Sequence, residues 1–190
     1  NRLYVISEKL AKENFIEALD ITRRDQMFRL NSYLFISEED PVNILSTPTL
    51  YEDLSSSEIV SAFGQNEYLP GYIIVKMYDF FKIMEGPIPN AYIPMIQTIE
   101  NNGQMMTTLN GTAVINSGKM IGKLNNEETA VLNVFLNEAT GGYYVVNVNG
   151  QKISVEVKNE KTEIEPILNG DQLKAHITVE IVGTFADNAS

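Results

Sequence analysis

Residues 113–129 read AVINSGKMIGKLNNEET and hold the densest run of secondary-structure signals in this chain. The opening apolar residues predict a strand, and residues 116–118 predict a tight turn because Asn and Gly tolerate positive φ. Residues 119–124 predict the returning strand. Asn125 is typical of a helix cap, and the carboxylate of Glu128 is spaced to reach back to the cap amide. The stretch therefore predicts a β-hairpin that leads into a helix.

Strands dominate the sequence on the C-terminal side of this motif. Asn149-Gly150 is a strong signal for a two-residue hairpin turn. Apolar and polar residues alternate at 153–157 and 175–181, which is the period of a sheet with one buried face and one wet face. We expect the helix at 126–139 to cover the dry face. The predicted strands are 104–115, 119–124, 143–149, 151–158, 161–168 and 172–185.

The N-terminal half is typical of helices and loops. Six of the chain's seven prolines lie between residues 41 and 94. Proline favours loops because it fixes φ and lacks a backbone N–H donor. Ser7 and Asp40-Pro41 indicate helix starts, and Ser55 with Glu58 reads as a second capping box. Apolar spacing from 73 to 84 predicts a further helix.

The composition changes near Asn101-Asn102-Gly103, where we place a domain boundary. Residues 1–101 are predicted to form a helix-rich α+β module. Residues 102–190 are predicted to form a mainly antiparallel sheet with one covering helix. The expected fold class is therefore α+β in two modules.

Composition excludes several kinds of chemistry. The chain has 190 residues, no cysteine, one histidine and a formal net charge of −11. A Cys nucleophile, a thiolate metal site and a multi-His metal site are excluded, whereas a carboxylate-only Mg²⁺ or Ca²⁺ site is not. An acidic chain repels phosphate, which disfavours nucleic-acid partners and docking onto anionic bilayers. No apolar run approaches the ~18 residues that a transmembrane helix needs.

Titratable residues in the second module favour a solvated surface over catalysis. His176 lies on the polar face of a predicted strand, with no nucleophile motif that points to it. Glu160, Glu163 and Glu165 stand among lysines, with no apolar pocket to shift a pKa. We therefore predict no catalytic, cofactor-binding or metal-binding residues.

Two clusters in the first module are candidates for recognition. Aromatic and apolar residues near Pro70-Gly71 form a candidate protein-contact patch: Phe63, Tyr68, Leu69 and Tyr72. Arg24, Asp25 and Arg29 belong to the densest mixed-charge cluster. Arginine forks there would recognise an anion or partner, or salt bridges would tie the first helix to the next strand.

Three stretches together resemble the Ger(x)C (GerAC-like) family, the C subunit of spore germinant receptors. They are the hairpin and helix of 113–129, an N-terminal LYVISEKLA at 3–11 followed by the Arg24-Asp25 pair and Arg29, and KTEIEP at 161–166 with its following strand. They occur in the family's order and span nearly the whole chain. The resemblance implies structural roles for Arg24, Asp25, Arg29, Gly122, Asn125 and Glu128.

The resemblance also implies a function. We expect a non-enzymatic lipoprotein C subunit of a nutrient-germinant receptor, which acts by protein–protein contact with the membrane-embedded A and B subunits. Its place would be the outer face of the spore inner membrane, held by an upstream lipidated Cys that this chain lacks. The chain would then be an internal fragment of the ectodomain, with a truncated N-terminal module and no cofactor.

Two other functions remain open. A small-ligand-binding lipoprotein domain predicts an apolar pocket with convergent polar groups. A carboxylate-dependent hydrolase predicts a close pair of carboxylates in a cleft, with perturbed ionisation.

Overall fold

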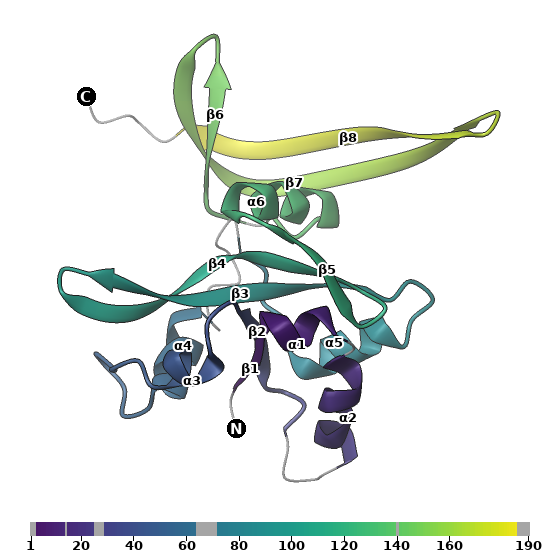
Figure 1. Cartoon of the computed structure of the whole chain (residues 1–190). Coiled ribbons are helices and arrows are strands. Elements are labelled where there is room, and N and C mark those ends of the chain that lie inside the picture. Colours follow the sequence, from purple (N-terminus) through teal and green to yellow (C-terminus); the bar gives the residue numbers. More distant parts are fainter. Residues whose placement is uncertain (1–2, 14, 25–28, 64–71, 140, 186–190) are drawn as a thin grey trace. The chain divides into compact units, whose positions relative to one another are not determined.

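The computed structural model describes residues 3–13, 15–24, 29–63, 72–139 and 141–185 (Figure 1). The chain divides into two compact units. Among the described residues, the first comprises those from 3 to 63 and from 72 to 128, and the second comprises those from 129 to 185.

The first unit is a five-stranded mixed sheet with helices. Its strands lie in the order β1-β2-β3-β4-β5; β1, β2 and β3 are parallel, and β3, β4 and β5 are antiparallel. The elements are β1 (Leu3–Ser7), α1 (Glu8–Lys12), α2 (Phe15–Arg24), β2 (Tyr33–Ser37), α3 (Pro41–Leu45), α4 (Ser55–Phe63), α5 (Met77–Met84), β3 (Asn90–Asn101), β4 (Gln104–Asn116) and β5 (Lys119–Leu124). Helix α6 (Asn126–Leu136) begins here and continues into the second unit.

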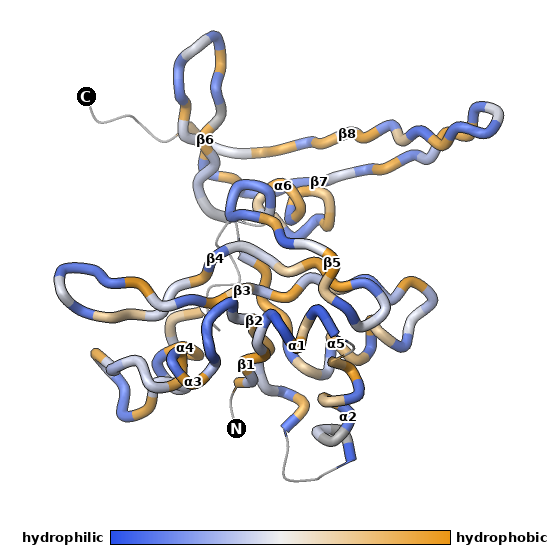
Figure 2. The backbone as a smooth tube through the Cα atoms, in the orientation of Figure 1, coloured by the Kyte–Doolittle hydropathy of each residue, from blue (hydrophilic) through white to orange (hydrophobic). Residues whose placement is uncertain are grey.

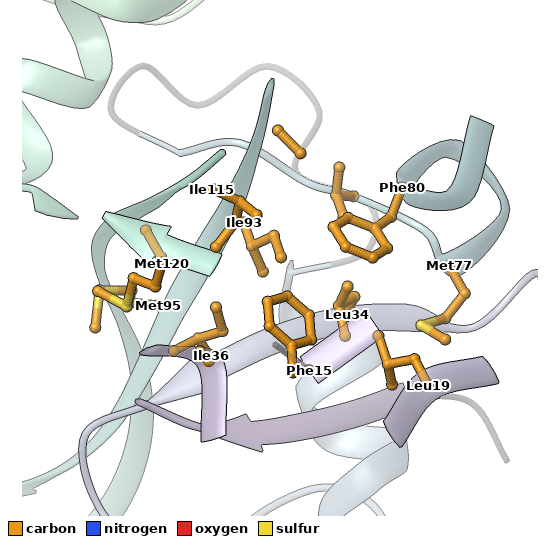
Figure 3. Close-up of a cluster of buried hydrophobic side chains, with 14 of the residues drawn as sticks. Phe15, Leu19, Leu34, Ile36, Met77, Phe80, Ile93, Met95, Ile115 and Met120 are labelled. Atoms are coloured by element: carbon orange, nitrogen blue, oxygen red, sulfur yellow. The ribbon is translucent and has the colours of Figure 1, made fainter. Parts of the chain in front are cut away.

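Alternation along β2 gives this sheet two buried faces. Leu34 and Ile36 pack in a core cluster with side chains of α2 and α5, where the Phe15 and Phe80 rings stack with centroids 5.6 Å apart (Figure 3). The intervening Phe35 belongs to a second cluster on the opposite face, with residues of α3 and α4. The helices therefore cover both faces of the central strand.

Helix caps at the surface follow the sequence pattern. The hydroxyl of Ser7 accepts the N–H of Leu10 at 3.3 Å, and the carboxylate of Asp40 accepts the N–H of Val42 at 2.9 Å. Pro41 opens α3, where its missing donor costs nothing. The predicted helix starts at these two positions are confirmed.

Strand β3 was not among the predicted strands. It contains Pro94, which discourages a strand assignment because proline cannot donate to a ladder. The structure accommodates Pro94 beside a bulge, where the pairing with β4 shifts between Pro94 and Ile96. The parallel contact of β3 with β2, at Met95 and Ile36, joins residues that are far apart in sequence.

The second unit contains an antiparallel sheet in the order β6-β7-β8. Its strands are β6 (Tyr143–Val148), β7 (Gln151–Asn169) and β8 (Gln172–Phe185). The predicted turn at Asn149-Gly150 is confirmed, with φ of 53° and 85°. The two strands predicted at 151–158 and 161–168 form one strand, β7, with a register shift between Val157 and Asn159.

The outer part of the β7–β8 hairpin keeps an apolar face exposed. Ile164 faces Ile177 across the ladder, and Leu168 faces Leu173; both leucines are 75% exposed. Figure 2 shows hydrophobic and hydrophilic residues alternating along both strands. The helix expected to cover the dry face is present as α6. Asn137, the residue after its end, bonds to Thr162 of β7, and β7 stays exposed beyond Thr162.

The predicted boundary near residue 101 lies inside the first unit. Asn102 and Gly103, with φ of 52° and 78°, form the turn between β3 and β4. The compact units divide later, between residues 128 and 129. The α+β fold class is confirmed, and the C-terminal part is rich in antiparallel sheet as expected.

Candidate functional site

The predicted capping box at the start of α6 is confirmed. The backbone N–H of Asn125 donates to Glu128 Oε2 at 2.8 Å, and the N–H of Glu128 donates to Asn125 Oδ1 at 2.9 Å. Each side chain satisfies a backbone donor that the first helical turn leaves without a partner. These two members of the family motif therefore have a local structural role.

Gly111, which the sequence pattern did not single out, supports the same motif. It has φ +76°, and a Cβ there would lie 2.0 Å from the carbonyl oxygen of Leu124. Its N–H donates to Asn126 Oδ1 at 2.6 Å. The motif residue Gly122, by contrast, has open space where a Cβ would stand. The sequence did contain a signal for Gly111: a glycine inside a predicted strand often marks a bulge or a close approach of backbone.

The charged cluster of the N-terminal helices lies at the surface. Arg24 pairs with Asp20 of its own helix at 2.6 Å, and the Arg24 side chain is 80% exposed. Arg29 is exposed, and its carbonyl accepts the N–H of Ser32. Asp25 lies outside the described residues. The observed ion pair therefore stays within α2, and the structural role of Arg29 remains a prediction.

The predicted contact patch is described only in part. Phe63 and Tyr72 are half-buried and pack against the core cluster that contains Phe35. Tyr68 and Leu69 lie outside the described residues. Phe63 also lines a surface cavity beside α4, so one member of the predicted patch borders a concave surface.

A concave apolar surface, which we call the α3–α4 groove, lies beside the loop of residues 46–54. A cavity of about 150 Å³ is bordered by this loop, by Ile59 and Phe63 of α4 and by Met106 of β4. A more open cavity of about 510 Å³ is bordered by residues of the same loop, by Leu45 of α3 and by Leu3. Sequence reasoning missed the groove because it joins a loop, a helix and a distant hairpin.

Two hydroxyl groups of the groove are turned toward the protein itself. The Ser55 hydroxyl donates to the carbonyl of Thr47 at 2.9 Å, and the Thr47 hydroxyl donates to the carbonyl of Asn43 at 3.1 Å. Both of these hydroxyl donors are therefore already used, and the groove presents apolar side chains beside the carboxylate of Asp53.

Glu58 holds the loop instead of capping α4. Its Oε2 accepts the backbone N–H groups of Leu50, Tyr51 and Glu52 at 2.7, 2.9 and 3.3 Å. Burial raises the pKa of Glu58, but these three donors lower it by more, so the net pKa lies below its ordinary value of 4.5. The predicted capping box of Ser55 and Glu58 is therefore wrong, because the loop backbone offers the carboxylate more donors.

The glutamates of residues 156–165, the segment in which a hydrolase would need its carboxylate pair, have local partners. Lys158 lowers the pKa of Glu156 and Lys161 lowers that of Glu163, through side-chain hydrogen bonds in both cases. Glu160 accepts the N–H of Ala139 at 3.2 Å and the hydroxyl of Thr162 at 2.9 Å. Glu165 is exposed and pairs across the ladder with exposed His176. A general acid needs a raised pKa, so the shifts of Glu156 and Glu163 run against that role.

The described residues offer neither a metal site nor a membrane-spanning helix. No group of three or more His, Cys, Asp or Glu side chains stands close enough to hold a metal ion in the part of the chain that the structure describes. Among the described helices, none combines the length and the apolar character that crossing a bilayer requires.

Comparison with protein families gives two adjoining matches. Residues 1–98 match the family described as "Spore germination protein N-terminal domain". Residues 110–190 match "Spore germination B3/ GerAC like, C-terminal". The chain therefore belongs to the GerAC-like family of spore germination proteins, and the resemblance inferred from the sequence is confirmed.

Two curated relatives and one solved structure agree with this assignment. Spore germination protein B3 of Bacillus subtilis (strain 168) is 23% identical over 98% of this chain and 50% of its own length. Spore germination protein YndF of the same strain is 34% identical over 90% of this chain and 42% of its own length. The crystal structure of the GerBC protein has a similar fold, with a TM-score of 0.72 at 21% identity.

The match to GerBC covers all of this chain and 55% of that structure. The chain thus spans about half the length of the relatives it matches. The similarity of fold therefore includes residues of both units.

Proposed function

We propose that this chain is part of the non-enzymatic C subunit of a nutrient-germinant receptor. The subunit is held by a lipid anchor at the outer face of the spore inner membrane. It acts by contact with the membrane-embedded A and B subunits.

The observation that carries the proposal is the pair of family matches over residues 1–98 and 110–190. A contact function also agrees with the side-chain chemistry. The carboxylate of Glu58 is engaged by backbone donors, and those of Glu156 and Glu163 are engaged by lysines. Apolar side chains are meanwhile exposed around the α3–α4 groove and on the β7–β8 hairpin.

The test is isolation of the complete protein, tagged at its C-terminus, from detergent-solubilised spore membranes of the organism that makes it. We expect membrane subunits of one germinant receptor to co-purify, and we expect deletion of the gene to slow germination with one class of nutrient. A tagged, unrelated spore lipoprotein is the control. Recovery without membrane subunits, together with normal germination of the deletion strain, would contradict the proposal.

The non-enzymatic part has its own test. The purified protein should leave nutrients and cell-wall fragments unchanged, as followed by mass spectrometry. Turnover that Glu160→Gln abolishes would identify an enzyme instead.

A further inference from the structure

The sequence around the α3–α4 groove is acidic and free of bases. Residues 30–75 contain seven acidic residues and no Lys, Arg or His, so this segment contributes −7 to the chain's charge of −11. Glu38 is compensated by Lys123, which reaches it from β5 at 2.5 Å. The bonds that hold Glu58 and Glu52 come from neutral donors, N–H groups and the Ser61 hydroxyl, and leave their negative charge in place.

The same segment exposes a group of large apolar side chains close together in sequence. Tyr51 is 91% exposed, and Leu54 is 63% exposed. Figure 2 shows hydrophobic residues along the loop that joins α3 to α4. The exposed large side chains are Val42, Leu45, Leu50, Tyr51 and Leu54. Five such residues within thirteen positions are typical of a recognition surface, because folding alone gains nothing from leaving them in water.

The apolar and acidic groups occupy the same loop. Leu54 and Asp53 both border the larger cavity, and Leu50 and Glu58 both border the smaller one. Glu52 and Asp53 are exposed, and they stand between Tyr51 and Leu54 in the sequence. An occupant that seats apolar side chains in this groove is therefore bordered by carboxylates, which attract cations and repel anions.

We propose that the α3–α4 groove binds a cationic amphipathic segment of a partner protein. Apolar side chains of that segment contact the groove and the exposed Tyr51 and Leu54. Its flanking Lys or Arg side chains face Glu52 and Asp53. The inference rests on the proposed contact function and names the chemistry of one contact.

Three other occupants of the groove are disfavoured: a second copy of this chain, an anionic lipid surface and a small polar ligand. A second copy of this chain would bring a charge of −11 against the same acidic surface. An anionic lipid surface is repelled for the same reason. A small polar ligand finds the hydroxyl donors of Thr47 and Ser55 already used.

The binding test uses three synthetic fluorescent peptides and the full chain. The probe is a helix of about 18 residues, built from Leu and Lys with one apolar face. The second peptide has the same composition in shuffled order, and the third replaces every Lys by Glu. We expect fluorescence anisotropy to show binding of the probe, at least about tenfold weaker binding of the other two, and weakening with added salt.

Matched variants locate the binding. Tyr51→Ser and Leu54→Ser are expected to weaken binding at least about fivefold each, because exposed anchors carry much of such a contact. Tyr78→Ser and Ile88→Ser remove comparably exposed apolar side chains elsewhere in the first unit and are expected to leave binding unchanged. All four positions are more than half exposed, so melting temperatures should stay close to that of the wild type.

Charge is tested in the same way. The double variant Glu52→Gln, Asp53→Asn should bind the probe more weakly and with a smaller dependence on salt. The control Glu17→Gln, Glu165→Gln removes two exposed charges elsewhere and should change neither. Equal effects of both pairs would show general attraction to an acidic protein and would overturn the proposal.

Other results also overturn it. They are binding of the Leu–Glu peptide as tightly as the probe, binding to vesicles of phosphatidylglycerol, or a dimer in sedimentation that Leu54→Ser abolishes. Co-purification with receptor subunits is a separate measurement. A groove that fails these peptide tests in a protein that still co-purifies would refute the inference and leave the proposed function standing.

Discussion

Asn137 and Thr162 are joined by both hydrogen-bonding groups of one side chain. Asn137 Nδ2 donates to the carbonyl of Thr162 at 3.1 Å, and Asn137 Oδ1 accepts the N–H of Thr162 at 2.6 Å. The amide thus replaces a neighbouring strand at this point of β7. Asn137 also has φ +57°, which asparagine tolerates better than most residues. One residue therefore both ends α6 and attaches it to the sheet.

Replacement of Asn137 separates these two roles. Asn137→Gly keeps the backbone conformation and loses both bonds, so we expect a loss of about 1–2 kcal/mol in the free energy of unfolding. Asn137→Ala should lose about 1 kcal/mol more than Asn137→Gly, because alanine, unlike glycine, is strained at positive φ. Urea denaturation measures both, and hydrogen exchange of the Thr162 amide should quicken in each. Unchanged exchange in the glycine variant would contradict a stabilising pair.

Gly111→Ala is expected to destabilise the first unit strongly. Its Cβ would stand 2.0 Å from the Leu124 oxygen in a backbone conformation that already disfavours alanine. We expect a loss of about 3 kcal/mol or more in the free energy of unfolding. Gly103→Ala is the matched control, since φ is +78° and nothing lies within 4 Å, so only about 1 kcal/mol should be lost. Similar thermal melting of the two variants would show that the close approach is unimportant.

The capping box predicts coupled losses. Asn125→Ala and Glu128→Ala should each destabilise the protein by about 1 kcal/mol, because each leaves an amide of the first turn without its partner. The double variant should lose less than the sum, since the two bonds support the same turn. A double-mutant cycle in urea measures this coupling. Strict additivity would mean that the two residues act independently.

Glu58 should make stability depend on acidity. Its folded-state pKa lies below 4.5, so its contribution is complete above the unfolded-state pKa and is lost as the pH falls through the folded-state value. Glu58→Gln should therefore melt below the wild type at about pH 7, and the difference should be smaller at about pH 3. A difference in melting temperature that is the same at both values would refute the role of the ionised carboxylate.

The features that were predicted correctly from the sequence depend on interactions between residues close in sequence. The turn at Ser117-Gly118, with φ of 47° and 81°, and the box of Asn125 and Glu128 depend on residues close in sequence, and both were predicted. Capping failed at Ser55 and Glu58 because a loop several residues upstream competed for the carboxylate. The sequence pattern alone does not indicate which backbone N–H groups the carboxylate of Glu58 will accept.

The features that were missed from the sequence depend on contacts between residues far apart in the chain. Strand β3 joins the sheet through Met95 and Ile36, and no spacing rule links those positions. The groove escaped detection for the same reason, because Met106 reaches it from a distant hairpin. One signal was nevertheless readable: residues 30–75 lack any base, and Leu50, Tyr51 and Leu54 interrupt an otherwise polar loop.

The long hairpin of β7 and β8 has a practical consequence for handling the protein. Its apolar face, with Leu168 and Leu173 at the tip, is exposed to solvent, and β8 is an edge strand of the described sheet. Such ribbons stick to one another unless something shields them. Samples should therefore be kept dilute or in mild detergent, and a charged residue at Leu173 is the first change to try when preparations turn cloudy.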